Sequence, residues 1–457
     1  MIFFYLITFI IGFLITKSFL KETENKFLIF SFSVAFGIAI ESFLMFILMM
    51  LNMNNYIIFL IAEIVLILIA VLISIRQKIE FFPKNKDKNN DKDKNKFLNV
   101  VFIIALLIGL IHIFYTIKME PYGTWDAHYM WNFRPKFFIA LEDIGENWKI
   151  FFKNISFWTH PDYPMLIPVY NYKNHILNGG YTPLLNAGTA ILIFSAVLSG
   201  VYGLINEISS RKNALLAVVI LLTTDCFIYW AVSQCADVPL SLFILTAIAA
   251  ISLFVKYKNN AYIFFAYYFA ASATFCKNEG LMFFLIFTII SLLLIKNQNK
   301  KMIICGALLP FICVFLHKSL LFLTCDLFEN QTLDLFISRL FSLERYKTIL
   351  YLVTKHIIEN FLTLIILFGV ICFSGFTNNN KVKTLGKMYI LIFIFAMLGY
   401  FAIYLITPRE LEWHINTTDL RLIVQYLPVF IIYCFTAFNC ANKKTASLNI
   451  EDKDNLQ

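Results

Sequence analysis

The sequence has little charge for its length. Asp, Glu, Lys and Arg make up 15% of its 457 residues, whereas hydrophobic residues make up 60% and the mean hydropathy is +0.73. A soluble globular chain is roughly one-quarter charged and about half apolar. This deficit of charge excludes an ordinary soluble domain and indicates that lipid surrounds most of the chain.

Patterns that bind metals or form disulfides are also missing. The nine cysteines are scattered, and no CxxC pair or cluster of His and Cys is present, so neither a disulfide framework nor a zinc site is indicated. The net charge of +9 does not indicate nucleic acid, because most Lys and Arg lie in short loops between apolar runs. The N-terminus lacks a basic region and a small-residue cleavage site, so we expect a first membrane span there and not a signal peptide.

Long apolar runs, by contrast, are abundant. A helix needs about 20 mainly apolar residues to cross the hydrocarbon of a bilayer. Thirteen runs meet or approach this length, at about 1–16, 27–51, 56–75, 97–117, 183–205, 214–231, 238–255, 261–276, 280–295, 302–323, 348–374, 388–407 and 421–440. The sequence therefore predicts an all-α, polytopic transmembrane helix bundle of about 13 spans. The runs at 261–276 and 280–295 are either two helices with a tight outer turn or one re-entrant unit.

The loops between these runs alternate in charge. Seven successive loops and ends on one side are basic: Lys17/Lys21/Lys26, the stretch 76–96, Arg211/Lys212, Lys256/Lys258, Lys296/Lys300/Lys301, Lys381/Lys383/Lys387 and Lys443/Lys444. Basic loops face the cytoplasm in membrane proteins. We therefore predict a multi-pass protein of the cell (inner or plasma) membrane, with its N-terminus outside and its C-terminus in the cytoplasm.

Composition also divides the chain into units. Residues 83–96 are almost entirely Lys, Asp and Asn and cannot build a core. The predicted units are an N-terminal three-span unit at 1–76, a disordered basic cytoplasmic linker at 77–96, a catalytic membrane core at 97–323 with a long outer loop at 118–182, C-terminal spans and outer loops at 324–441, and a cytoplasmic tail at 442–457.

Residues suited to chemistry concentrate in the other, outer set of loops. They occur at 123–134, 160–164, 234–239, 276–280 and 407–421. Ionisable groups near membrane depth are rare unless they are paired or functional, and carboxylates among apolar and basic neighbours are candidates for a general base or a metal ligand. Because all these motifs fall on one side, together they indicate a site more strongly than any one of them does.

Each motif also has a purely structural interpretation. Asp126 and Asp237 can each cap a helix, the His-Pro-Asp-Tyr-Pro run at 160–164 can be a rigid turn, and Lys277 and Glu279 can simply pair with each other. Similarly, Trp125 can be an aromatic anchor at the membrane interface.

The order of the motifs resembles a known superfamily. Trp-Asp-Ala-His-Tyr-Met-Trp-Asn at 125–132, His-Pro-Asp-Tyr-Pro-Met-Leu at 160–166, Ala-Asp-Val-Pro-Leu at 236–240, Lys-Asn-Glu-Gly-Leu at 277–281 and the segment 407–414 follow one another. In this order they resemble bacterial GT-C glycosyltransferases, similar to the protein-mannosyltransferase and lipid A aminoarabinose-transferase group. The resemblance covers roughly residues 97–425, so the first three spans lie outside it.

The resemblance implies a fold and an activity. A GT-C-like core with outer-face loop helices would move a sugar from a polyprenyl-phosphate donor to an acceptor hydroxyl on the extracytoplasmic face, by an inverting displacement. Asp126 would be the general base, and Asp237 would orient the acceptor or, together with Asp126, hold a divalent metal. Lys277 would bind the donor phosphate, with Arg134 as a second candidate.

The remaining expectations concern substrates and metal. Further candidate substrate-binding residues are Glu279, Asp162, His160, His414, Glu412 and Trp125. The first outer loop has no adjacent Asp-Glu pair of the kind that the mannosyltransferases carry, so the resemblance alone does not establish a divalent metal at Asp126 and Asp237. Asp162 is either a functional substitute for one member of that pair or structural. The expected partners are the lipid-linked sugar donor, a glycan or lipid-linked acceptor and membrane lipids, with no nucleic acid.

Two other functions stay open at this point. A glycan polymerase or ligase that uses polyprenyl-diphosphate glycans typically depends on outer-loop Arg and His, which His160, Arg134, Arg409 and His414 could supply. A transporter or flippase would show charges or helix breaks near the midplane and repeated halves. The charges instead gather at one surface and no repeat is evident, so the transporter ranks last.

Overall fold

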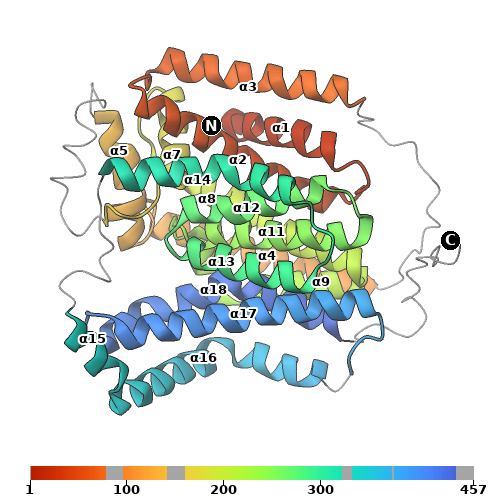
Figure 1. Cartoon of the computed structure of the whole chain (residues 1–457), viewed down its shortest axis with the longest axis vertical. Helices are drawn as coiled ribbons and strands as arrows, with labels where there is room; N and C mark the ends of the chain where they lie inside the picture. Colours follow the sequence, from red (N-terminus) through yellow and green to blue (C-terminus); the bar gives the residue numbers. More distant parts are fainter. Residues whose placement is uncertain (1, 79–95, 141–159, 322–331, 373–374, 439–457) are drawn as a thin grey trace, which may run out of the picture.

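The computed structural model describes residues 2–78, 96–140, 160–321, 332–372 and 375–438. In these ranges the chain is helical, and the one β-type pairing is an isolated bridge between Phe376 and Phe438. The predicted all-α bundle is therefore confirmed (Figure 1). Most of the predicted linker at 77–96, the middle of the long outer loop and the tail at 442–457 lie outside the described residues.

The helices follow the predicted order. The first group comprises α1 (Ile2–Phe19), α2 (Lys26–Met50), α3 (Tyr56–Arg76), α4 (Lys96–Met119), the short π-helix η1 (Ala127–Trp131), α5 (Phe133–Ala140) and α7 (Leu166–Leu177). The middle group comprises α8 (Pro183–Ile208), α9 (Arg211–Thr223), α10 (Asp225–Val232), α11 (Asp237–Tyr257), α12 (Ala261–Cys276), α13 (Glu279–Leu294) and α14 (Lys300–Leu321). The last group comprises α15 (Leu333–Leu340), α16 (Leu343–Cys372), α17 (Asn380–Ile406) and α18 (Leu411–Ala437).

Many of these helices can cross a membrane. Ten are long and apolar enough by length and composition, and α9 with α10, bent by 73°, makes an eleventh if the two form one broken span. Both α12 and α13 are shorter, at 16 residues each. Each of the thirteen predicted apolar runs corresponds to one helix or to the bent pair, so a multi-pass membrane protein is confirmed, whereas the count of thirteen spans stays a prediction.

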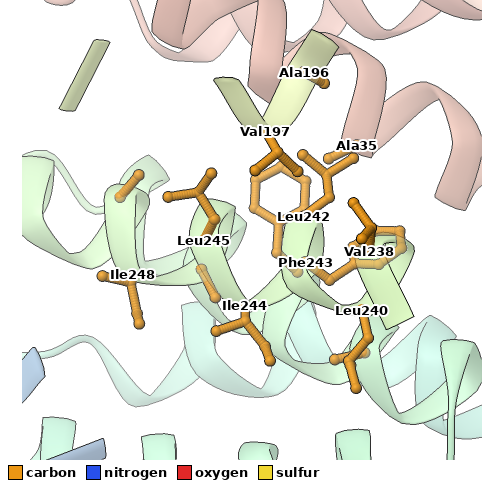
Figure 2. Packing of buried hydrophobic residues seen from close by; sticks show 14 of the residues in the cluster. Ala35, Ala196, Val197, Val238, Leu240, Leu242, Phe243, Ile244, Leu245 and Ile248 are labelled. Atoms are coloured by element: carbon orange, nitrogen blue, oxygen red, sulfur yellow. The ribbon is translucent and has the colours of Figure 1, made fainter. Parts of the chain in front are cut away.

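Helix α11 lies at the centre of the bundle. Its apolar residues surround the whole helix, and the window that would cross the membrane is fully buried, as expected for a helix that is hydrophobic on all sides. Figure 2 shows Val238, Leu242 and Phe243 of α11 among Val197 of α8 and Ala35 of α2. Any polar residue at the start of α11 is thus held by a rigid scaffold.

The first helices pack directly on this core. A Cβ at Gly12 of α1 would lie 1.9 Å from the carbonyl oxygen of Ser33 in α2, so the two helices cross at a distance that only glycine allows. Phe32 of α2 in turn stacks on Phe269 of α12, with ring centroids 5.7 Å apart. Residues 1–76 are therefore integrated into the bundle, and their treatment as a separate unit stays a prediction.

The two ends of the bundle differ as the loop charges suggested. At one end Lys21 donates to the carbonyl oxygen of Gln77 at 2.7 Å, and Asn259 donates to Glu22 at 2.8 Å, which brings three of the basic loops together. In Figure 1, the α1–α2 and α16–α17 connections lie at this right-hand end, whereas α5, α7 and α15 lie at the opposite, left-hand end. The motif-bearing loops belong to that opposite end.

Candidate active site

The centre of the site is the carboxylate of Asp237, the first residue of α11. This residue has no exposed surface. One oxygen accepts bonds from Lys277 Nζ at 2.8 Å and Gln425 Nε2 at 2.7 Å, and the other accepts from Arg421 Nε and Nη2 at 3.1 and 3.0 Å. A carboxylate at a helix N-terminus is also favoured by the helix dipole. With four donors and no access to solvent, Asp237 is suited to fix two cations in place.

Asp126 lies on the other side of the same arginine. Arg421 Nη1 donates to Asp126 Oδ2, and the guanidinium lies over the ring of Trp230, 5.0 Å from its centroid. Unlike Asp237, Asp126 has 26% of its side-chain surface exposed. It precedes η1 but makes no side-chain capping bond to it, so the helix-capping interpretation of Asp126 is not what the structure shows.

Two tight loops hold Asp126 at this position. Gly123 has a φ of +77°, and a Cβ there would lie 2.6 Å from the carbonyl oxygen of Ser233, so the site requires glycine for both conformation and space. From the facing loop, Gln234 accepts a bond from Asn132 Nδ2 at 2.7 Å. These contacts clamp the start of the long outer loop onto the segment that leads into α11.

Lys277 joins the cluster from the turn between α12 and α13. Its ammonium lies 2.8 Å from Asp237 and 2.7 Å from Glu279, which has 14% of its side-chain surface exposed. The turn is tight because a Cβ at Gly280 would lie 1.9 Å from the carbonyl oxygen of Ala273. The pairing of Lys277 with Glu279 that the sequence allowed is therefore present, but as part of a larger network.

Five charged groups thus alternate in sign. In spatial order they are Asp126, Arg421, Asp237, Lys277 and Glu279, which sum to a formal charge of −1 (three carboxylates and two cations). The network is buried in its middle and opens at its two ends. Adjacent Arg and Lys groups are suited to bind phosphate, and a partly exposed carboxylate is suited to accept a proton.

Asp162 lies next to this network. Its carboxylate accepts a bond from Asn278 Nδ2 at 2.7 Å, and Lys318 of α14 donates to Asn278 Oδ1 at 3.1 Å and to the carbonyl oxygen of Asp162. Asn278 follows Lys277 directly. Lys318 is therefore a cation near the site that the sequence had not singled out.

The run at 160–164 folds as a turn. The amide of Tyr163 donates to the carbonyl oxygen of His160 at 3.0 Å, and His160 has a φ of +43°. Arg134 is fully buried and donates to the carbonyl oxygens of Tyr163, at 2.8 Å, and His160. Burial lowers the pKa of Arg134 to about 10, although the Asp162 carboxylate opposes this shift. The structure thus uses Arg134 to hold the turn and does not bring its guanidinium into the charged network.

The other predicted substrate-binding residues lie at the rim. Trp125 is 54% exposed and packs on Tyr129, with ring centroids 4.8 Å apart. Glu412 is exposed on the first turn of α18, and the ring of His414 packs edge-on against Tyr404, 5.2 Å between centroids. Glu412 and His414 precede Arg421 by about two turns of helix. Trp125 directly precedes Asp126 in the chain.

The donor set does not fit a divalent metal. Both oxygens of Asp237 are already bound by cations, and Arg421 lies between Asp237 and Asp126. Within the described ranges no three His, Cys, Asp or Glu residues are grouped so that they could hold a metal ion.

Sequence reasoning did not assign Arg421 or Gln425 to the site. Both lie on α18 at positions four residues apart, and therefore on one face of the helix. The sequence had suggested that the last span begins at 421, whereas α18 begins ten residues earlier, at Leu411. The sequence feature that could have identified them is that two polar residues, four positions apart, stand at the start of an apolar run.

A comparison with protein families agrees with this geometry. Residues 186–319 match the family described as dolichyl-phosphate-mannose-protein mannosyltransferase, a segment that contains Asp237, Lys277 and Glu279 but not Asp126 or Arg421. No curated protein and no solved structure matches the chain. The resemblance to the GT-C superfamily is confirmed over this segment, and the match supports a multi-pass membrane glycosyltransferase of the GT-C type.

Proposed function

We propose that the protein transfers a sugar from a polyprenyl-phosphate donor to an acceptor hydroxyl at the Asp126 end of the charged network. The observation that carries this proposal is the partly exposed carboxylate of Asp126, which is paired with Arg421. Buried Asp237 holds Arg421 in place and holds a second cation, Lys277, through its other oxygen. A donor phosphate needs the cations, and an acceptor hydroxyl needs the carboxylate.

The chemistry is a single displacement. Asp126 takes the proton of the acceptor hydroxyl, the acceptor oxygen attacks the anomeric carbon, and the bond from that carbon to the phosphate oxygen breaks. The electron pair of this bond stays on the phosphate, so negative charge grows there in the transition state. Arg421 and Lys277 stabilise that charge from fixed positions, and inversion at the anomeric carbon follows from the single step.

Asp237 acts in this proposal as a positioning residue. It is fully buried and its lone pairs are engaged by four donors, so it is poorly suited to exchange a proton with substrate. Its negative charge compensates Arg421 and Lys277 in a site that would otherwise hold two buried cations. The two acids of the site therefore have different roles because their environments differ.

The location on the extracytoplasmic face is part of the same proposal. The basic loops meet at the opposite end of the bundle, and such loops are cytoplasmic by the positive-inside rule. This supports an N-terminus outside, a C-terminus inside, and placement in the cell (inner or plasma) membrane. A lipid-linked donor can then reach the site laterally, from the outer leaflet.

A second candidate function is supported by one observation. Lys318 donates to the side chain of Asn278, the residue that follows Lys277 in the chain. With this third cation near the network, a polyprenyl diphosphate suits the site better than a monophosphate. A glycan polymerase or ligase would use such a donor. Purified protein supplied with sugars on polyprenyl monophosphate and, separately, on polyprenyl diphosphate distinguishes the two functions by which donor is consumed.

The decisive test is the Asp126→Asn variant in lipid nanodiscs. We expect transfer from a polyprenyl-phosphate sugar to fall by at least about 1,000-fold, because the amide cannot accept the proton, while expression and thermal stability stay close to wild type. Asp334→Asn, which changes an exposed carboxylate at the start of α15, is the matched control. Retained transfer in Asp126→Asn removes this residue from the base role, and a wild-type protein that uses no such donor contradicts the proposed function.

A further inference from the structure

Arg421 is shared between two carboxylates that differ in how many other partners they have. Asp237 also accepts from Lys277 and Gln425. For Asp126, Arg421 is the one side chain among the described residues that bonds its carboxylate. The contact to Asp126 can therefore be given up without disturbing how Asp237 holds the arginine.

This contact conflicts with the role of Asp126 as a base. Its Oδ2 already accepts a bond from Arg421, and an oxygen engaged in this way is not available to accept the proton of the acceptor hydroxyl. As the structure stands, the residue placed to deprotonate the acceptor is held in an ion pair.

Donor binding can resolve this conflict by charge alone. The network carries a formal charge of −1, and a phosphodiester adds another negative charge. Two cations cannot neutralise four anions, so the phosphate competes with a carboxylate for a cation. Asp126 and Glu279 each have one charged partner, and Asp237 has two. Of the three carboxylates Asp126 is the most exposed, with 26% of its side chain accessible against 14% for Glu279 and none for Asp237, so an incoming phosphate can displace it most readily.

We propose that Arg421 is a catalytic residue that exchanges Asp126 for the donor phosphate, so that donor binding frees the base before the acceptor reacts. This inference rests on the proposed function. Arg421 stays anchored to Asp237 through Nε and Nη2, at 3.1 and 3.0 Å, and over Trp230. The Nη1 side, now on Asp126, turns to a phosphate oxygen.

The exchange matches the charges of the reaction. As the acceptor proton moves to Asp126, that carboxyl becomes neutral and loses its attraction for Arg421. As the bond between the anomeric carbon and the phosphate oxygen breaks, the phosphate gains the negative charge. The guanidinium therefore stabilises the charges that develop during the step more than it stabilises the charges of the resting protein. This difference in stabilisation accelerates transfer.

Chemical labelling of carboxyl groups can detect the released base. Wild-type protein in nanodiscs is treated with a water-soluble carbodiimide and an amine, with and without polyprenyl monophosphate, and labelling at Asp126 is mapped by mass spectrometry. We expect a several-fold rise in labelling with polyprenyl monophosphate and none with the uncharged polyprenol. In Arg421→Gln, labelling should be high from the start and should not respond to either lipid.

Arg345→Gln is the matched control, because Arg345 binds the backbone carbonyl oxygens of Tyr404 and Thr407 and no carboxylate of the network. It should behave as wild type. Binding of polyprenyl monophosphate is measured in parallel. If the lipid binds but labelling of Asp126 does not rise, or if polyprenol raises it equally, the exchange is wrong while the proposed function stands. If the lipid does not bind at all, both are wrong.

Transfer kinetics give an independent readout. Arg421→Gln should raise the donor KM and lower kcat together, because the arginine contacts the phosphate both before and during the step. Arg421→Lys keeps the charge and should partly restore donor KM. If an Arg421 variant has a lower kcat and an unchanged donor KM, the proposed contact between Arg421 and the donor phosphate is wrong.

Discussion

Two buried clusters of charge differ in whether their charges can reach a ligand. Besides the network at Asp126 and Asp237, Lys173 of α7 lies 2.6 Å from Glu41 of α2 and 3.1 Å from Glu63 of α3. This second cluster is also one negative charge in excess. Its side chains are at most 2% exposed, however, whereas the first network opens at Asp126.

This difference in exposure distinguishes buried charges that hold the fold together from buried charges that can take part in chemistry. In the Lys173 cluster, Thr8 of α1 donates to Glu41 at 2.8 Å, so four elements, α1, α2, α3 and α7, are tied at one sealed point. The network at Asp126 joins η1, α11, α18 and the α12–α13 turn, but leaves its two end carboxylates, Asp126 and Glu279, with a single charged partner each. A sealed cluster fixes helices, and an open one can exchange a partner for substrate.

The largest expected effect is on folding, from Lys173→Met. Loss of the ammonium leaves Glu41 and Glu63 buried without a cation, and breaking a buried pair in this way costs about 3–5 kcal/mol. The variant should express poorly or lose most of its thermal stability in detergent. Lys136→Met, which changes an exposed lysine of the neighbouring α5, is the control. A Lys173→Met protein of wild-type stability would show that the sealed cluster does not hold α7.

The next effect is on catalysis, from Lys277→Gln. Asp237 keeps Arg421 and Gln425, so the loss of stability should be smaller than in Lys173→Met. Removing one electrostatic donor to the leaving phosphate should lower kcat by about 100- to 1,000-fold. Transfer assays and melting curves on the same preparations check both parts. If Lys277→Gln destabilises the protein as much as Lys173→Met does, the proposed difference between the sealed cluster and the open network is wrong.

The sequence predicted the helices better than the contacts between them. Apolar length and loop charge are local properties, so all thirteen runs correspond to helices or to the bent pair. The bond between Arg421 and Asp126 joins residues 295 positions apart, and it depends on how η1, α11 and α18 pack. Nothing near either residue in the sequence specifies the other.

The start of α18 was misplaced for a related reason. Its first turns carry polar and exposed residues such as Glu412 and Trp413, so they do not resemble a membrane span. Similarly, the sequence places Lys173 in a predicted outer loop, yet α7 packs against α2 and α3 near Glu41 and Glu63 and is almost wholly buried. Burial of a loop helix follows from the assembled bundle and has no local signature.

The smallest expected effect comes from Glu63→Gln. Two carboxylates and one lysine leave an excess negative charge in a site without solvent, and burial of an unpaired charge is strongly unfavourable. Glu41 accepts bonds from both Lys173 and Thr8, whereas Glu63 meets Lys173 in one ion pair at 3.1 Å and neither of its oxygens accepts a hydrogen bond within the described residues. Glu63→Gln removes the excess charge and gives up fewer contacts, so stability should change by less than about 1 kcal/mol, as for removal of one modest hydrogen bond. Glu41→Gln should lower the melting temperature more, and the reverse order would show that the contacts of Glu41 do not hold the cluster.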